Sequence, residues 1–205
     1  MNYESHETPQ PFSVWEMYEV AAQRVSSPMT IGLYVATAVE YLPYNSVSRR
    51  VAKSVGEIIV THDDTLQVEH VGSTAVPGCW GKGIIDLLVM YAPGCLASAR
   101  ETLDRLGFQR QSGPEPFPES RPMRVGSVEH LGRNYRLHAH IIEKGIAEAV
   151  NLVRFRDLLR ENGELRRAYE AEKRSILARG VTQGSEYSKA KGDFIHIALG
   201  AFGDD

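Results

Sequence analysis

The sequence predicts an α+β protein, with a mixed β-sheet flanked by helices and a C-terminal α-helical subdomain after it. Two short runs rich in β-branched and apolar residues, 66–71 and 84–91, are bounded by Gly, Pro and Asp, which is typical of strands. Two further strands, over about 121–128 and 134–143, should form a hairpin. From Ala147 onward, apolar residues instead recur at helical spacing in three segments.

The remaining elements follow from the same patterns. Apolar residues at helical spacing predict helices over about 14–25 and about 46–59, with Ser46 as the N-cap of the second. A helix over 96–106 is stopped by Gly107, and another strand begins near residue 108. We expect an N-terminal extension over residues 1–40, an α/β domain over 41–145 and a helical subdomain over 146–205.

Composition narrows the classes of function. The chain has 205 residues and a formal net charge of −3, so any binding of a phosphorylated ligand must come from a local basic site. We expect no nucleic acid as a partner, because the sequence shows no aromatic residues interleaved with a basic stripe. Cys79 and Cys95 lack the spacing of a zinc site and fit a reducing cytoplasm. We also expect no secretion signal and no membrane segment.

The most specific segment, over 68–89, holds a strand, a small-residue turn, a lysine-bearing loop and a second strand with one acid. Its residues His70 to Gly78, followed by Lys82 and Ile84-Ile85-Asp86, closely resemble the central motif of the GrpB family, which is grouped with the nucleotidyltransferase fold. The resemblance continues through 136–140, 155–160, 169–173 and 187–191, and it covers roughly residues 40 to 200. It implies a nucleotidyltransferase-like fold for the sheet domain.

The loop departs from the family's usual pattern. Where the family has Pro-Gly-Leu and Ala-Lys-Pro, this chain has Pro77-Gly78-Cys79 and Gly81-Lys82-Gly83. The first 40 residues also lie outside the pattern.

The Gly-Ser turn after the first strand is a candidate phosphate site. Glycine lets backbone N–H groups approach a phosphate closely, and a serine hydroxyl donates one more hydrogen bond. We therefore expect Gly72, Ser73 and Thr74 to contact phosphates, with Lys82 neutralising their charge. The alternative is a tight turn with a hydroxyl cap and no ligand.

Asp86 is the candidate chemical centre. In nucleotidyltransferases such a turn is normally followed by two acids two residues apart, which share a strand face and hold divalent metal. Here Leu88 stands at the second position, so two metal ions cannot be held by this strand. We expect Asp86 to bind at most one Mg²⁺, weakly. Its alternative role is a strand-end salt bridge or cap.

Two histidines add to this centre. Arg136, His138 and His140 alternate along one strand and therefore share a face. Imidazoles in this arrangement suit metal ligation, phosphate contact or acid–base catalysis. The resemblance implies that this strand lies next to the strand over 84–91, close enough for Asp86 to face His138 or His140. We take all three residues as catalytic and metal-binding candidates. Structural histidines on a half-exposed sheet are the alternative.

Further cations are candidates for phosphate binding. Arginines surround the two middle strands, and the resemblance favours Arg124 or Arg121, with Arg136 beside the histidines. The resemblance also places Lys173 and Lys191 in Tyr-x3-Lys positions of the helical part, from which they could reach a triphosphate. The alternative is that each arginine is a solvated surface residue.

These residues leave three hypotheses open. The first is an enzyme that binds a nucleoside triphosphate with Mg²⁺ and transfers a nucleotidyl or phosphoryl group. The second is a catalytically degenerate module that binds a nucleotide or a phosphorylated metabolite. The third is a metal-dependent hydrolase built on Asp86 and the two histidines, with zinc or manganese. A second acid near Asp86, such as Glu69 or Glu143, would favour the first.

Overall fold

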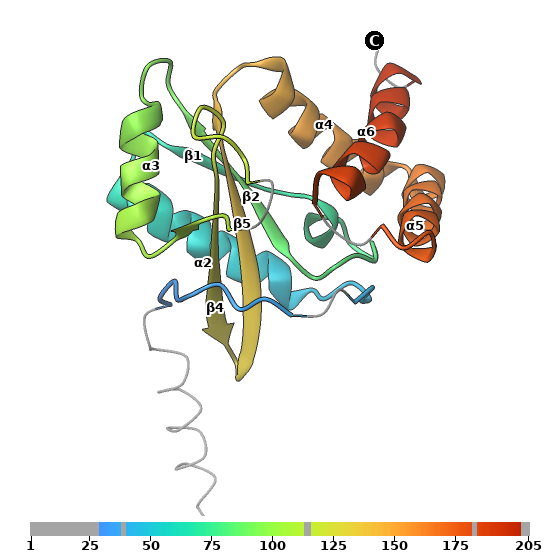
Figure 1. The fold of residues 1–205 in the computed structure, drawn as a ribbon, viewed down its shortest axis with the longest axis horizontal. Helices are drawn as coiled ribbons and strands as arrows, with labels where there is room; N and C mark the ends of the chain where they lie inside the picture. Colours follow the sequence, from blue (N-terminus) through green and yellow to red (C-terminus); the bar gives the residue numbers. More distant parts are fainter. Residues whose placement is uncertain (1–28, 38–39, 113–115, 182–183, 202–205) are drawn as a thin grey trace, which may run out of the picture.

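The computed structural model describes residues 29–37, 40–112, 116–181 and 184–201. Five strands within these residues form one sheet in the order β1-β2-β5-β4-β3. The strands are β1 (Gln67–Val71), β2 (Ile85–Tyr91), β3 (Gln109–Arg110), β4 (Met123–His130) and β5 (Arg133–Glu143). The helices are α2 (Val47–His62), α3 (Leu96–Arg105), α4 (Ala147–Glu161), α5 (Gly163–Ala178) and α6 (Gly184–Ala201), as Figure 1 shows.

The sheet is mixed, which confirms the predicted α+β class. Strands β2 and β5 run parallel in the centre, while β1 pairs with β2, and β4 with β3 and β5, in antiparallel fashion. In the parallel pair Asp86 lies opposite His138 and Leu88 opposite His140. The prediction that these two strands are neighbours is therefore confirmed.

One face of the sheet carries the main apolar core. Ile85, Leu87 and Val89 alternate along β2 toward this face, where they pack with Val55 and Ile59 of α2. Helix α3 lies on the same side, so α2 and α3 together cover it (Figure 1). Because these side chains are fully buried, the centre of this face is an apolar core.

The opposite face is covered by the C-terminal helices over one part only. Leu88 and Ile142 pack there with Ala149 of α4. A second cluster joins Val76 and Cys79 of the β1–β2 loop to α4, α5 and α6. The helical end of the chain is thus packed against the loop that carries the Gly72-Ser73 turn. The division of the chain at residues 40 and 145 stays a prediction.

Most predicted elements lie where the sequence placed them, with ends shifted by a few residues. The predicted helix over 14–25 lies outside the described residues. Ser46 stands at the predicted N-cap position of α2, but its side chain makes no capping hydrogen bond and its backbone angles are helical. Asn45 takes this role, and its Oδ1 accepts a hydrogen bond from the N–H of Val47 at 3.0 Å. Among the described helices, none is long and apolar enough to cross a membrane.

Residues 29–37, which we call the edge segment, lie along the sheet beside β4 (blue in Figure 1). Gly32 and Ser127 exchange two backbone hydrogen bonds, of 2.8 and 3.1 Å. The N–H of Val35 donates to Oγ of Ser127 at 3.0 Å, and that of Tyr34 to Oε1 of Gln109 at 2.8 Å. Part of the predicted N-terminal extension is therefore fixed to the sheet.

Candidate functional site

The loop between β1 and β2 begins with a turn that requires glycine at its first position. Gly72 has φ 70° and ψ −173°, a backbone conformation that residues with a Cβ rarely adopt. A Cβ on Gly72 would also lie 2.4 Å from Oδ2 of Asp86. The missing side chain therefore lets the Asp86 carboxylate rest directly against the backbone of the turn.

The far end of the same loop is held against Ser73. A Cβ on Gly81 would lie 2.2 Å from Oγ of Ser73 and 3.8 Å from Nζ of Lys173. The buried ammonium of Lys173 donates hydrogen bonds to the carbonyl oxygen of Trp80 and, at 3.5 Å, to Sγ of Cys79. Burial lowers the pKa of Lys173. A cation from α5 thus lies beside the Ser73 hydroxyl.

Asp86 faces both histidines of β5. Its Oδ1 lies 3.8 Å from Nδ1 of His138 and 3.7 Å from Nε2 of His140, distances that are electrostatic contacts rather than hydrogen bonds. Burial alone would raise the pKa of Asp86, but the contacts with the histidines and the charge of Lys191 outweigh it, so the pKa is lowered. The carboxylate is therefore ionised at neutral pH.

His138 is neutral at neutral pH. Burial, only partly opposed by Asp86, lowers its pKa to about 4. Its Nε2 lies 3.2 Å from the hydroxyl of Tyr34 in the edge segment, and the two ring centroids are 5.7 Å apart. Because Nδ1 faces the carboxylate, we assign the ring proton to Nδ1, and Nε2 then accepts the hydrogen bond from Tyr34.

His140 is more enclosed than His138. Its Nε2 faces Asp86, while its Nδ1 is buried and has no hydrogen-bond partner in the described part of the chain. The ring of Phe117 packs edge-on against it, with centroids 5.8 Å apart. His140 is therefore held by packing on one side and by Asp86 on the other.

Lys82 and Lys191 meet over one aromatic ring. Their Nζ atoms lie 3.5 and 4.5 Å from the ring centroid of Tyr187. Burial and the nearby charge of Lys191 lower the pKa of Lys82 to about 8. Burial also lowers the pKa of Lys191, although Asp86 opposes the shift. We call Asp86, the two histidines and these two lysines the Asp86 cluster.

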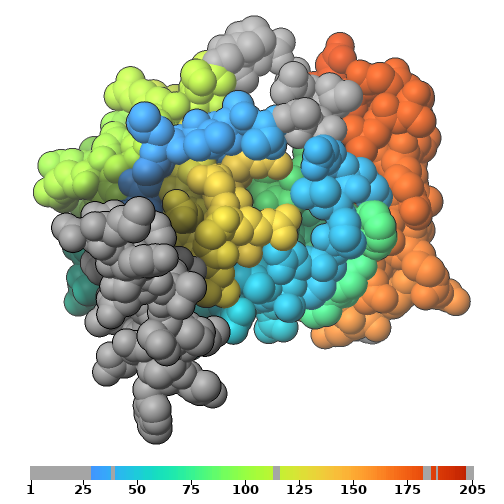
Figure 2. Space-filling view, turned by 90° about the horizontal axis from the view of Figure 1, so that it is seen from below, coloured from blue at the N-terminus to red at the C-terminus, as the bar shows by residue number. Residues whose placement is uncertain are grey.

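A cavity of about 710 Å³ opens beside the Asp86 cluster. Its walls include Ser73, Gly81 and Arg136, but not Asp86 itself. Nη2 of Arg136 donates to the carbonyl oxygen of Lys82 at 2.7 Å, which ties the loop to β5. Figure 2 shows this side of the molecule hollowed between the edge segment (blue), the start of α2 (cyan) and the β4–β5 hairpin (yellow).

Arg124 does not join this group, and the structure gives no support to its predicted phosphate contact. It lies opposite Ala139, so strand alternation directs its side chain to the face that α3 covers. The guanidinium is 1% exposed and donates to the carboxylates of Asp104 and Glu119 at distances from 2.6 to 3.5 Å. Arg124 is a structural cation of the α3 side.

The hydroxyl of Thr74 has hydrogen-bond partners within the protein, and a phosphate role for this hydroxyl has no support in the structure. The hydroxyl donates to the carbonyl oxygen of Ile84 at 3.0 Å. Nε2 of His70 lies 3.0 Å from the hydroxyl oxygen of Thr74 and donates a hydrogen bond to it, because the Thr74 proton is used toward Ile84. Because the single hydroxyl proton is already used, Thr74 has none left for a phosphate.

The residues present do not fit a Mg²⁺ site. In the part of the chain that the structure describes, no group of three or more His, Cys, Asp or Glu side chains is placed to hold a metal ion. Oε2 of Glu69 forms an ion pair with Nη1 of Arg156 at 2.6 Å, and Glu143 lies at the far end of β5 from His138. Asp86 is left with two imidazoles, whereas Mg²⁺ prefers oxygen ligands. The metal-ligand role of this trio therefore stays a prediction without support, and with it the hydrolase hypothesis.

Sequence reasoning missed three contributors to this region. Tyr34 lies outside the family resemblance, and no local pattern points to its contact with His138. Arg160 donates from Nε and Nη2 to the carbonyl oxygen of Ala75, at 3.2 and 3.0 Å. Arg156 donates from Nη1 to the carbonyl oxygen of His70 at 3.0 Å. The family-like segment 155–160 contains both arginines, and that was the available signal.

Comparisons with known proteins identify the family and the fold of this chain. The family model described as "GrpB protein" matches residues 40–200. A UPF0157 protein of Halalkalibacterium halodurans is 32% identical over 165 residues, which are 78% of this chain and 78% of that protein. A UPF0157 protein of Streptomyces coelicolor is 34% identical over 130 residues, 63% of this chain and 65% of that protein. The crystal structure of the conserved protein GrpB from Enterococcus faecalis shares the fold, with 19% identity, a TM-score of 0.55, and coverage of 78% of this chain and 99% of that one.

Proposed function

The chain belongs to the GrpB family, and we propose that it binds a nucleotide or another phosphorylated small molecule at the Asp86 cluster and the adjacent cavity. The observation that carries this proposal is the gathering of three cations, one buried and two partly buried, from separate segments around one loop. Lys82 comes from the β1–β2 loop, Lys173 from α5 and Lys191 from α6.

The charge balance of the site favours an anion. Arg136 and the three lysines surround the loop, against the carboxylates of Asp86 and of Glu170, whose Oε1 accepts a hydrogen bond from the N–H of Trp80 at 3.0 Å. Burial disfavours the charged form of all three lysines, because it removes water from the ammonium groups. A bound phosphate would restore charge-assisted hydrogen bonds to these cations.

The shape of the site suits a ligand with a phosphorylated end. Gly72 and Gly81 remove side chains from the two ends of the loop, and Ser73 presents a hydroxyl between them. The adjacent cavity of about 710 Å³ is within the range of small-molecule sites. We propose that the phosphates lie near Ser73 and Lys82 while the rest of the ligand occupies the cavity.

Binding in this proposal does not depend on Mg²⁺. Asp86 acts as the counter-charge that holds the lysines and histidines together. Replacing it with asparagine removes a negative charge from an anion site, so metal-free binding should be unchanged or tighter in Asp86→Asn. A loss of metal-free affinity in this variant would contradict the role we give to Asp86.

Transfer of a nucleotidyl or phosphoryl group is the second candidate, and one observation favours it. His138 is neutral, its Nδ1 faces the carboxylate of Asp86, and its Nε2 faces the hydroxyl of Tyr34. An acceptor hydroxyl that displaced Tyr34 could give its proton to this nitrogen. Release of pyrophosphate or phosphate from a nucleoside triphosphate in the presence of candidate acceptors, lost in His138→Ala, would establish this function.

A thermal-shift screen tests the binding proposal. The full chain is melted with each of the four ribonucleoside triphosphates and with pyrophosphate, in EDTA and in Mg²⁺. At least one ligand should raise the melting temperature in EDTA by a few degrees, because binding to the native state stabilises it. The shift should vanish in Lys82→Ala. Shifts of the melting temperature that occur only with Mg²⁺ would contradict the proposal, and so would the absence of a shift with every ligand.

A further inference from the structure

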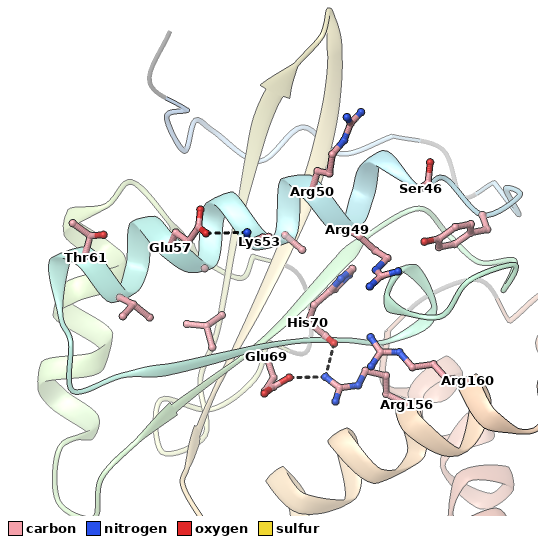
Figure 3. A pocket seen from close by; sticks show the side chains of 15 residues that line it. Ser46, Arg49, Arg50, Lys53, Glu57, Thr61, Glu69, His70, Arg156 and Arg160 are labelled. Carbon is pink, nitrogen blue, oxygen red and sulfur yellow. Dashed lines mark hydrogen bonds and ion pairs between the residues drawn. The ribbon is translucent and has the colours of Figure 1, made fainter. Parts of the chain in front are cut away.

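A second cavity lies on the other side of the turn formed by residues 72–75, which we call the phosphate turn. It has a volume of about 870 Å³ and is bounded by α2, β1 and α4 (Figure 3). Tyr44 and Ser46 belong to the walls of both cavities, so the start of α2 separates them. Neither Asp86 nor the lysines of its cluster line this second space.

The charges in this cavity are not evenly spread. Arg49 of α2, His70 of β1 and Arg156 and Arg160 of α4 gather at one end, which we call the basic end (Figure 3). Glu57 lies toward the opposite end, where it pairs with Lys53 at 3.5 Å. A compact anion therefore fits the basic end, whereas a long polyanion crossing the cavity would meet a carboxylate.

The basic end holds one cation without an internal partner. Arg156 is bonded to Glu69 and Asp157, and Arg160 to Asp157. Among the residues described, Arg49 makes no ion pair, and its guanidinium is directed toward His70 in Figure 3. His70 itself is neutral, because burial, with the charges of the three arginines added, lowers its pKa to about 4.

The same side chains are bonded to the phosphate turn. Arg160 donates to the carbonyl oxygen of Ala75, and Arg156 to that of His70. His70 also donates to Thr74. The basic end and the turn are thus two sides of one hydrogen-bonded unit.

We propose that the basic end is a second anion site, which binds a phosphoryl group of a small phosphorylated ligand through residues outside the Asp86 cluster. Arg49 supplies the uncommitted guanidinium. Arg156 and Arg160 add positive charge beside it, although their own N–H groups already donate to Asp157, Glu69 and backbone carbonyl oxygens. Anion binding there competes with the backbone carbonyl oxygens for the two α4 arginines. Occupancy of the basic end therefore changes the turn on which the Asp86 cluster depends.

NMR titration of the ¹⁵N-labelled full chain with inorganic pyrophosphate tests this site by position. Saturable shifts are expected for the backbone amides at the start of α2 and for Nε–H of Arg49 and Arg160. Arg49→Ala should weaken this binding about tenfold, since a charge-assisted hydrogen bond is lost. Arg50→Ala is the matched control: its guanidinium points away from His70 in Figure 3, and we expect no more than about a twofold effect.

The outcomes separate this proposal from the first one. Shifts at residues 72–83 that are lost in Lys82→Ala report the Asp86 cluster, and shifts at α2 lost in Arg49→Ala report the basic end. Equal weakening by Arg49→Ala and Arg50→Ala, or shifts that never saturate, would show only diffuse attraction and overturn the second site. An oligothymidylate that bound α2 more tightly than pyrophosphate would overturn it in favour of a nucleic-acid surface.

Discussion

The hydroxyl oxygen of Tyr34 lies 3.2 Å from Nε2 of His138. Residue 34 precedes the segment that matches the family model, which begins at residue 40. The edge segment is anchored by hydrogen bonds to Ser127 and Gln109, so the position of Tyr34 is fixed by the sheet. The site of this chain therefore contains a side chain that the family pattern does not specify.

Removing this hydroxyl should raise the pKa of His138. A hydrogen bond donated to Nε2 stabilises the neutral ring, so in Tyr34→Phe the pKa rises from its value of about 4. The measurement is a pH titration of the histidine ring signals by NMR. Tyr44→Phe is the control and should leave the His138 titration unchanged. A His138 pKa that is the same in Tyr34→Phe as in the parent would show that the hydroxyl does not donate to Nε2.

Gly72→Ala should destabilise the fold more than an equivalent change elsewhere. Both its backbone angles and the 2.4 Å approach to Oδ2 of Asp86 oppose a Cβ, so we expect a loss of about 3 kcal/mol in the free energy of unfolding. Gly94 has φ 83° but open space around it, and Gly94→Ala should cost only about 1 kcal/mol. If urea unfolding gave the same loss of free energy for Gly72→Ala and Gly94→Ala, the close contact between Asp86 and the turn would be contradicted.

Ligand affinity should depend on pH through Lys82. Its pKa is about 8 in the free protein, and a bound phosphate raises it by favouring the charged form. Binding therefore takes up a proton above pH 8. Affinity should be full below about pH 7 and fall as the pH rises through 8, by up to about tenfold per unit. Lys82→Arg keeps its charge and should give a nearly flat profile from pH 7 to 9. A fall of the same size in this variant would assign the dependence to another group.

Arg124→Ala separates stability from binding. This buried guanidinium holds Asp104 and Glu119, so its loss should lower the free energy of unfolding by about 2–3 kcal/mol. Arg105→Ala removes an arginine that is 68% exposed and should change stability by less than about 0.5 kcal/mol. Both variants should bind ligand like the parent at a temperature where they are folded. Loss of ligand binding by folded Arg124→Ala would contradict its assignment to the α3 side.

Local patterns predicted the strands of the sheet, whereas the meeting of Asp86 with the histidines was expected from the family resemblance, which implies that their strands are neighbours. Alternation along β5 puts His138 and His140 on one face, and the strand signatures on either side of the turn fix where Asp86 stands. Arg124 was named as a phosphate ligand from the family resemblance, which did not establish on which face of the sheet its side chain lies. A shift of one residue in the position of a strand moves each side chain to the opposite face of the sheet.

The contacts of Tyr34, Arg156 and Arg160 could not be predicted in the same way. Tyr34 reaches His138 across 104 positions of the chain, through an edge pairing of a few residues that leaves no periodic signal. The two arginines lie on a helix whose charges resemble an ordinary solvated face. Their bonds to backbone carbonyl oxygens depend on how α4 docks against β1, which is a property of the tertiary structure.

The central claim is that partly buried lysines make the Asp86 cluster an anion site that works without metal. Titration calorimetry in EDTA, with the nucleotide that gives the largest thermal shift, tests it most directly. Lys82→Ala should weaken binding at least about tenfold, since a charge-assisted contact in a partly buried site is lost. Lys144→Ala, which removes an exposed lysine, should leave the affinity unchanged. Equal affinities of Lys82→Ala and the parent protein would contradict the claim.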